Sequence, residues 1–106
     1  MPEDGRAEGT VFSGAKPCYV YVLGSDGAGG ARTYVGWTTD LERRLAAHNS
    51  GKGARSTRGR QWRLIYAERC KDRSAALRRE WRLKRDRGFR KLLSGLTHDA
   101  AGARSA

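Results

Sequence analysis

The sequence predicts an α+β domain, a small three-stranded antiparallel sheet flanked by three helices in the order β-β-α-β-α-α. Three short stretches are rich in β-branched and aromatic residues, as strands are, and they lie at 18–23, 32–37 and 62–68. Three other stretches carry helix start signals or helical spacing, and they lie at 40–49, 75–85 and 89–93. With 106 residues, 38% of them hydrophobic, the chain has room for one domain with a small core.

The first two strands are expected to form a hairpin. Residues 25–30 (SDGAGG) between them are rich in turn formers, and the connection is longer than the tightest hairpin turns. In the third strand the alternation of apolar and polar residues is blurred at Leu64 and Ile65, which leaves its buried face unassigned.

The first helix is predicted to begin with a capping box, in which Thr39 is the N-cap and Glu42 reaches back to it. It should end near Gly51, a residue that suits a left-handed helix terminus. One face of this helix carries Leu41, Leu45 and His48.

The second helix is capped by Asp72 or Ser74 and should be broken at Gly88. Its predicted apolar face is the set that recurs at helical spacing, namely Leu77, Trp81 and the stem of Lys84. We interpret the tryptophans as packing residues rather than as platforms for stacked bases; they are Trp37, Trp62 and Trp81.

The folded unit is predicted to span residues 17–96, between a flexible arm at 1–16 and a flexible tail at 97–106. No apolar run is long enough to cross a membrane, and no signal peptide is recognisable, so we expect a cytoplasmic protein. Cys18 and Cys70 form no metal-binding or disulfide pattern, and we expect two reduced, buried thiols.

The basic charge points to a nucleic-acid partner. The formal net charge is +11, and the segment 41–91 holds 18 basic and five acidic side chains. Residues 50–61 contain no acid and no large apolar side chain, so they are expected to form an exposed loop. Four cations of this loop are predicted to bind DNA: Lys52, Arg55, Arg58 and Arg60.

Several motifs follow one another in a characteristic order. The triplet Tyr-Val-Tyr at 19–21 precedes Tyr-Val-Gly at 34–36. Arg44 and His48 follow in the first helix, and Glu80 lies in the second. In this order the motifs resemble the GIY-YIG nuclease family, over roughly residues 18–94. The resemblance is closest to small stand-alone bacterial members, in which a stretch like HNSGKGARSTRGR follows the first helix.

The resemblance implies a catalytic role for five residues and a divalent metal ion. Tyr21 and Tyr34 match the tyrosines of the two motifs that give the family its name, here the triplets at 19–21 and 34–36. Arg44 matches the helical arginine, and His48 a histidine found in some of these nucleases. Glu80 matches the carboxylate that holds a single Mg²⁺ or Mn²⁺ ion.

The chain departs from the family pattern at three points. Tyr19 stands where the first element has glycine. Trp37 follows the second element, where some members place a lysine that assists the nucleophile. No downstream asparagine is clearly matched.

The residue types also suit phosphodiester hydrolysis by water. Arg44 and His48 are four apart on a helix and therefore neighbours. A guanidinium can bind two phosphate oxygens. A phenol with a pKa near ~10 must share its proton to act as a base, and a histidine such as His48 is a suitable acceptor for Tyr21.

The sequence therefore predicts a metal-dependent DNA endonuclease acting on duplex or branched DNA, structure-selective and linked to repair or recombination. One alternative is a catalytically inactive DNA- or RNA-binding module of the same fold. Another is a small basic RNA-associated protein with structural tyrosines. At the level of residues, Tyr21 and Tyr34 could be sheet packing and Arg44 a solvated charge. His48 could be a satisfied semi-buried histidine, and Glu80 an ion-pair partner of Arg79 or Lys84.

Overall fold

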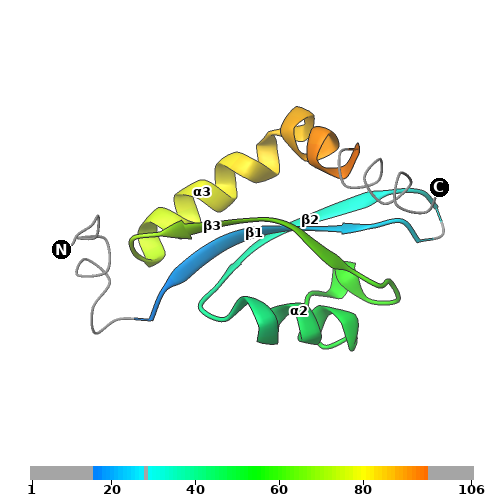
Figure 1. Cartoon of the computed structure of the whole chain (residues 1–106), viewed down its shortest axis with the longest axis horizontal. Helices are drawn as coiled ribbons and strands as arrows, with labels where there is room; N and C mark the ends of the chain where they lie inside the picture. The colour runs from blue at the N-terminus through cyan, green and yellow to red at the C-terminus, as the bar shows by residue number, and fades with distance from the viewer. Residues whose placement is uncertain (1–15, 28, 96–106) are drawn as a thin grey trace, which may run out of the picture.

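The computed structural model of the chain describes residues 16–27 and 29–95. The elements in order are β1 (Cys18–Ser25), β2 (Arg32–Thr38), α2 (Leu41–Asn49), the 3₁₀ turn η1 (Arg55–Thr57), β3 (Arg63–Cys70) and α3 (Arg73–Arg85). Residues 87–95 form a further helical segment. The predicted α+β order is confirmed (Figure 1). The predicted arm 1–16, except for Lys16, and the predicted tail 97–106 lie outside the described residues.

The sheet is antiparallel and its strand order is β2-β1-β3, so β1 is the central strand. In this register Tyr21 lies opposite Gly36 on one side and Ala67 on the other. The motif at 19–21 and the motif at 34–36 are thereby brought side by side.

A β-bulge explains the blurred alternation in the third strand. The β1–β3 register shifts between Val22 and Leu23, whose partners are Tyr66 and Leu64. Ile65 is the extra residue, so the strand changes the face it presents at that point.

The two faces of the sheet are covered by different helices, α3 on one and α2 on the other (Figure 1). Alternate residues of a strand point to opposite faces. Val20 and Val22 accordingly pack in one cluster with Ala76 and Leu83 of α3. On the other face a second cluster is formed by Tyr21, Leu23 and Trp62, against which Leu41 and Leu45 of α2 pack.

The predicted capping box of the first helix is wrong by one residue. The N-cap is Asp40, whose carboxylate accepts a 3.1 Å hydrogen bond from the amide of Arg43. Thr38 accepts a bond from the amide of Asp40 and so fixes the chain just before the helix. The predicted end is confirmed, since Gly51 adopts a φ of 82° directly after the C-cap Ser50.

α3 is capped by Asp72, one of the two predicted residues. The predicted break at Gly88 is wrong: α3 ends at Arg85, and Gly88 lies within the helical segment 87–95. Asp86 makes this break, because its carboxylate accepts a 3.0 Å bond from the amide of Phe89 and caps the new segment.

The predicted apolar face of the second helix is also wrong. The residues of α3 that are buried against the sheet are Ala76 and Leu83. Leu77 is 41% exposed and Trp81 is 61% exposed, so neither belongs to the core. Trp62 is buried and Trp37 packs half-buried against the core, so both are packing residues as expected, whereas for Trp81 that expectation is wrong.

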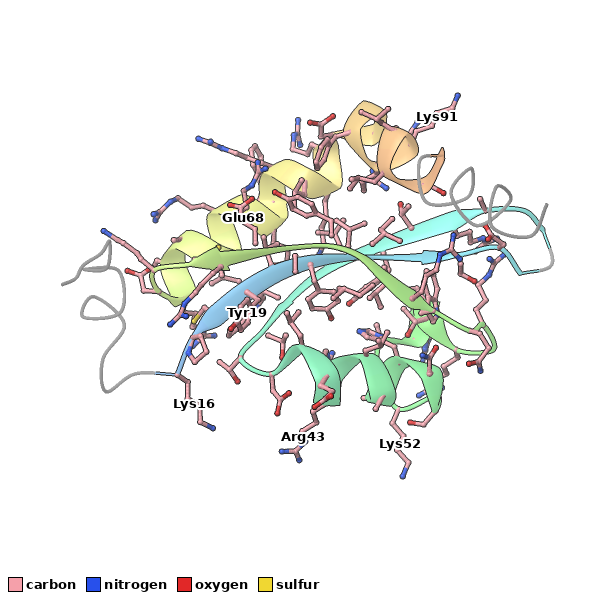
Figure 2. The ribbon with its side chains drawn as sticks, viewed as in Figure 1. Lys16, Tyr19, Arg43, Lys52, Glu68 and Lys91 are labelled. Carbon is pink, nitrogen blue, oxygen red and sulfur yellow. The ribbon has the colours of Figure 1, made fainter. Side chains whose placement is uncertain are left out.

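An ion pair fixes the rotation of α3 over the sheet. Arg79 donates a 3.0 Å bond to the carboxylate of Glu68 on β3, which also accepts from the hydroxyl of Tyr66 at 2.7 Å. On the other flank, the guanidinium of Arg73 lies 5.6 Å from the ring centre of Trp37 on β2. Figure 2 shows Glu68 on the side of the sheet that faces α3.

Cys18 and Cys70 are free and buried, as predicted, and they lie opposite each other in β1 and β3. Among the described residues no helix is long and apolar enough to span a membrane. The cytoplasmic location stays a prediction.

Candidate active site

Tyr21 is the centre of the site. Its side chain leaves the central strand on the α2 side and is only 2% exposed. Its hydroxyl lies 2.8 Å from Nε2 of His48, the last residue but one of α2. The predicted pairing of a strand tyrosine with a helix histidine is therefore present in the fold.

The hydrogen bonds around His48 all donate in the same direction, from Tyr21 through His48 and Thr57 to Ala54. The hydroxyl of Thr57 donates to the carbonyl of Ala54 at 2.8 Å, so towards the imidazole it can only accept. Nδ1 of His48 lies 2.9 Å from that hydroxyl oxygen and must carry the proton that Thr57 accepts. Nε2 then has a free lone pair, which accepts the Tyr21 O–H.

Burial keeps both partners of this bond neutral. Desolvation lowers the pKa of His48, and the positive charge of Arg44 lowers it further. Desolvation raises the pKa of Tyr21 to about 12, although a hydrogen bond from Arg44 opposes the rise. At neutral pH the pair therefore consists of a protonated phenol and a neutral imidazole.

Tyr34 completes a cluster of three rings. Its ring centre lies 6.3 Å from that of Tyr21 and 4.8 Å from that of His48. Tyr34 itself is half-buried, so this side of the cluster reaches the surface.

Gly36 leaves the space that the Tyr21 hydroxyl occupies. A Cβ at this position would lie 2.6 Å from the hydroxyl oxygen and 3.1 Å from Cε2 of Tyr34. The distance to the hydroxyl oxygen is shorter than any side-chain Cβ tolerates, and the distance to Tyr34 is tight, so the glycine of the Tyr-Val-Gly motif leaves room for the ring of Tyr21.

Arg44 lies one helical turn before His48 and is half-buried, whereas its neighbour Arg43 is exposed and points away from the sheet (Figure 2). The influence of Arg44 on both Tyr21 and His48 places its charge at the ring cluster. With its O–H donated to His48, the hydroxyl oxygen of Tyr21 keeps lone pairs that can accept hydrogen bonds.

Glu80 approaches from the other helix. Arg73 lies two helical turns before Glu80 and therefore on the same side of α3. Because Arg73 stacks on Trp37 of β2, this side of α3 faces β2. The negative charge of Glu80 contributes to the raised pKa of Tyr21, although it is the smallest of the contributions. Its carboxylate forms a 3.2 Å ion pair with Lys84 and not with Arg79.

A metal ion at this site would have one protein ligand. Within residues 16–27 and 29–95 no three His, Cys, Asp or Glu side chains gather into a metal-binding group. A single carboxylate such as Glu80 suits Mg²⁺, which keeps several waters and takes substrate phosphate oxygens as further ligands. The donor set therefore fits a hard divalent cation that is bound mainly together with substrate.

The four loop cations are not equivalent. Lys52, Arg55 and Arg58 are exposed, and Lys52 points away from the sheet (Figure 2). Arg60 is half-buried and donates a 3.1 Å bond to the carbonyl of Gly30, so it ties the loop to the β1–β2 hairpin.

The sequence prediction missed the interior of this loop. Thr57 is fully buried although it lies in a basic segment expected to be exposed. A Cβ at Gly53 would come closer than 2.5 Å to Nδ1 of His48, so that glycine lets the loop pass over the imidazole. In the sequence, the packing of this loop over His48 is indicated only by Gly53 and by the small β-branched residue Thr57.

A second set of bonds closes the loop. The side-chain amide of Asn49 donates to the carbonyl of Trp62 at 3.0 Å and accepts from its backbone amide at 2.5 Å. The indole of Trp62 in turn donates to the carbonyl of Thr57 at 2.8 Å. Together these bonds hold Thr57 beneath His48.

A comparison with known families covers this part of the chain. The model of the GIY-YIG catalytic domain matches residues 17–92, which include the rings, Arg44 and Glu80. The chain belongs to the GIY-YIG family. The predicted resemblance is thereby confirmed, and GIY-YIG domains form an endonuclease superfamily.

This GIY-YIG domain also has named relatives. A UPF0213 protein of Natronomonas pharaonis is 45% identical over 67 residues, 62% of this chain and 75% of the relative. A UPF0213 protein of Streptococcus pneumoniae is 49% identical over 69 residues, 63% of this chain and 66% of the relative. UPF0213 protein YhbQ of Escherichia coli is 41% identical over 78 residues, 61% of this chain and 78% of the relative. No solved structure matches the chain.

Proposed function

We propose that this GIY-YIG domain is a metal-dependent DNA endonuclease that hydrolyses phosphodiester bonds with water as the nucleophile. The observation that carries the proposal is the directional chain of hydrogen bonds from the Tyr21 hydroxyl through His48 to Thr57. These bonds give Tyr21 an acceptor with a fixed tautomer, as a proton relay requires.

In the proposed reaction a water molecule donates a hydrogen bond to the hydroxyl of Tyr21. As the water oxygen bonds to phosphorus, its proton passes to Tyr21, and the phenolic proton passes to Nε2 of His48. The phosphorus–oxygen bond to the leaving group breaks, and the leaving alkoxide takes a proton from solvent. The positive charge that forms on His48 is stabilised by the hydrogen bond from Nδ1–H to the hydroxyl oxygen of Thr57.

Arg44 and Glu80 are proposed to stabilise the negative charge of the phosphate, Arg44 directly and Glu80 through a metal ion. The guanidinium of Arg44 would bind phosphate oxygens as negative charge builds on them. Glu80 would hold the Mg²⁺ or Mn²⁺ ion, which supplies neutralisation of phosphate charge when it is bound. Tyr34 borders the exposed side of the ring cluster and would contact the substrate there.

DNA is proposed to lie across the basic surface beside α2. Lys52, Arg55 and Arg58 would contact phosphates, which position DNA without reading sequence. We therefore propose selection by DNA structure, such as branches, flaps or ends. A role in repair or recombination rests on the family alone.

One observation favours a second candidate, a binding module without catalysis. The carboxylate of Glu80 already has a partner in Lys84, and a metal ion must compete for it. If Glu80 stays paired with Lys84 in the presence of DNA and binds no metal ion, the domain binds nucleic acid and does not cut it.

Replacing Glu80 with glutamine tests the proposal. Cleavage of a labelled branched duplex is measured across a Mn²⁺ titration for wild type and Glu80→Gln, with circular dichroism to confirm folding. The matched control is Glu42→Gln, the same chemical change at an exposed position of α2. We expect Glu80→Gln to abolish cleavage and keep DNA binding, while the control cleaves like wild type. Full cleavage by folded Glu80→Gln would refute the metal assignment, and no cleavage by wild type would favour the binding module.

A further inference from the structure

Two large apolar side chains on α3 have no place in the core. Trp81 is 61% exposed and Leu77, one turn before it, is 41% exposed. α3 packs on the sheet through the smaller Ala76 and through Leu83 instead. Together they form an exposed apolar surface on a helix that is otherwise polar on its outer side.

The exposed pair lies beside Glu80. Arg79 is fixed over β3 by Glu68, so the flank of α3 that carries Glu80 is turned to β2. Successive helical residues are rotated by about 100°. Leu77 and Trp81 therefore stand on the outer side of Glu80, next to the proposed metal ligand and further from the sheet.

The surroundings of Trp81 are strongly basic. The guanidinium of Arg85 lies 4.6 Å from its ring centre. The whole of α3, from 73 to 85, carries six cations and one acid. An apolar ring in such a field suits a partner that is both anionic and able to stack.

A protein partner fits these observations less well. Stable protein interfaces bury ~800 Å² on each side, whereas Trp81 and Leu77 together offer a few hundred Å² at most. A nucleic-acid strand needs only one base face against the ring, and its phosphates match the arginines.

We propose that Trp81 and Leu77, with Arg85, form a stacking site for an unpaired base of DNA next to the phosphate to be cleaved. The inference rests on the proposed function and specifies its substrate, because a base inside a duplex has no free face to offer. A base stacked on Trp81 would place its neighbouring phosphate towards Glu80. The site would thus select DNA with an unpaired nucleotide, such as a flap, over continuous duplex.

Two DNA probes with equal charge isolate stacking from electrostatics. One is a fluorescein-labelled duplex with a short single-stranded tail of thymidines. The other has the same tail with abasic residues, which keep the phosphates and lack the bases. Affinities are measured by fluorescence anisotropy in EDTA, so that no cleavage occurs.

We expect wild type to bind the thymidine tail about tenfold more tightly than the abasic tail, a usual contribution of one stacked base. Trp81→Ala should reduce this ratio to near one, and Trp81→Phe should keep part of it. The control is Leu92→Ala, which removes another exposed apolar side chain, 57% exposed, from the helical segment 87–95. Its ratio should equal that of wild type.

Three results would overturn the inference: a ratio near one in wild type, an unchanged ratio in Trp81→Ala, or equal loss of affinity for both probes. The same holds if sedimentation shows a dimer that Trp81→Ala makes monomeric, because the surface then binds a second copy. The readout is separate from cleavage. A tenfold ratio without any cleavage would refute the proposed nuclease and keep the stacking site.

Discussion

The imidazole of His48 and the hydroxyl of Thr57 form a 2.9 Å hydrogen bond in which neither side chain is exposed to solvent. Because Thr57 gives its own proton to Ala54, this contact determines which nitrogen of His48 can accept from Tyr21. A fully buried residue of the loop thus sets the protonation pattern of His48.

Thr57→Val should disable this arrangement while keeping the side-chain volume. Nδ1–H of His48 would be buried without an acceptor, at a cost of about 1–3 kcal/mol in the free energy of unfolding. We expect the cleavage rate to fall by about 10²-fold. The control Thr57→Ser keeps the hydroxyl and should retain most of the rate. Denaturant unfolding and single-turnover cleavage measure both effects, and equal rates in the two variants would contradict the role of the hydroxyl.

Arg44→Ala should lower the cleavage rate by about 10²–10³-fold, the usual loss of one donor to a transition-state anion. DNA affinity should change little, since many other cations remain. Arg43→Ala removes the same charge from the neighbouring, exposed position and should leave the rate near that of wild type. Equal losses of rate in the two variants would make Arg44 an ordinary phosphate contact.

Gly36→Ala should abolish cleavage because the added methyl group would displace the hydroxyl of Tyr21 from His48. Overpacking of this kind destabilises by about 1–3 kcal/mol. The control Gly88→Ala places a methyl group where the nearest atom is 3.8 Å away, and within a helix it should stabilise by about 0.5–1 kcal/mol. Thermal denaturation and cleavage distinguish the two, and a fully active Gly36→Ala would show that the hydroxyl position is not critical.

The lowered pKa of His48 predicts a loss of stability in acid. The folded state resists protonation of His48, while the unfolded state binds the proton near the ordinary pKa of about 6.5. The free energy of unfolding should therefore be highest above pH ~6.5 and fall as the pH drops below it towards the folded pKa. His48→Gln should lack this part of the decline, since His98 is common to both proteins. Parallel stability curves would contradict the prediction.

Neutralising Lys52, Arg55 and Arg58 with glutamine should flatten the salt dependence of DNA binding. The slope of log affinity against log salt falls by ~0.9 for each phosphate that the protein no longer neutralises. The control removes three charges from the cleft between the hairpin and the segment 87–95, namely Arg32, Arg87 and Lys91. An unchanged slope in the loop variant would place the DNA elsewhere.

The strands and helices could be predicted because they depend on local patterns. The exposed face of α3 could not, since Leu77 and Trp81 recur at the spacing of a buried face and their exposure is decided by where Ala76 and Leu83 dock. Thr57 was missed for a related reason. A threonine in a basic loop gives no sign of burial, and it is buried here by partners that the fold brings together, His48 and Trp62.

The five site residues themselves were predicted from the order of motifs. The structure brings Tyr21, Tyr34 and His48 into direct contact and Arg44 into their field. The ion pair of Glu80 with Lys84 was foreseen only as one of two possible pairs, because helical spacing allows several partners for one carboxylate.

The central position of β1 gives the two ends of the hydrogen-bonded chain from Tyr21 to Thr57 different local stabilities. Tyr21 lies on a strand paired on both sides, so its amide should be among the slowest to exchange with deuterium. Thr57 lies in a three-residue 3₁₀ turn, which opens far more readily than a central strand. On warming, we expect the turn to open first, so that the proposed cleavage activity is lost several degrees before the sheet melts.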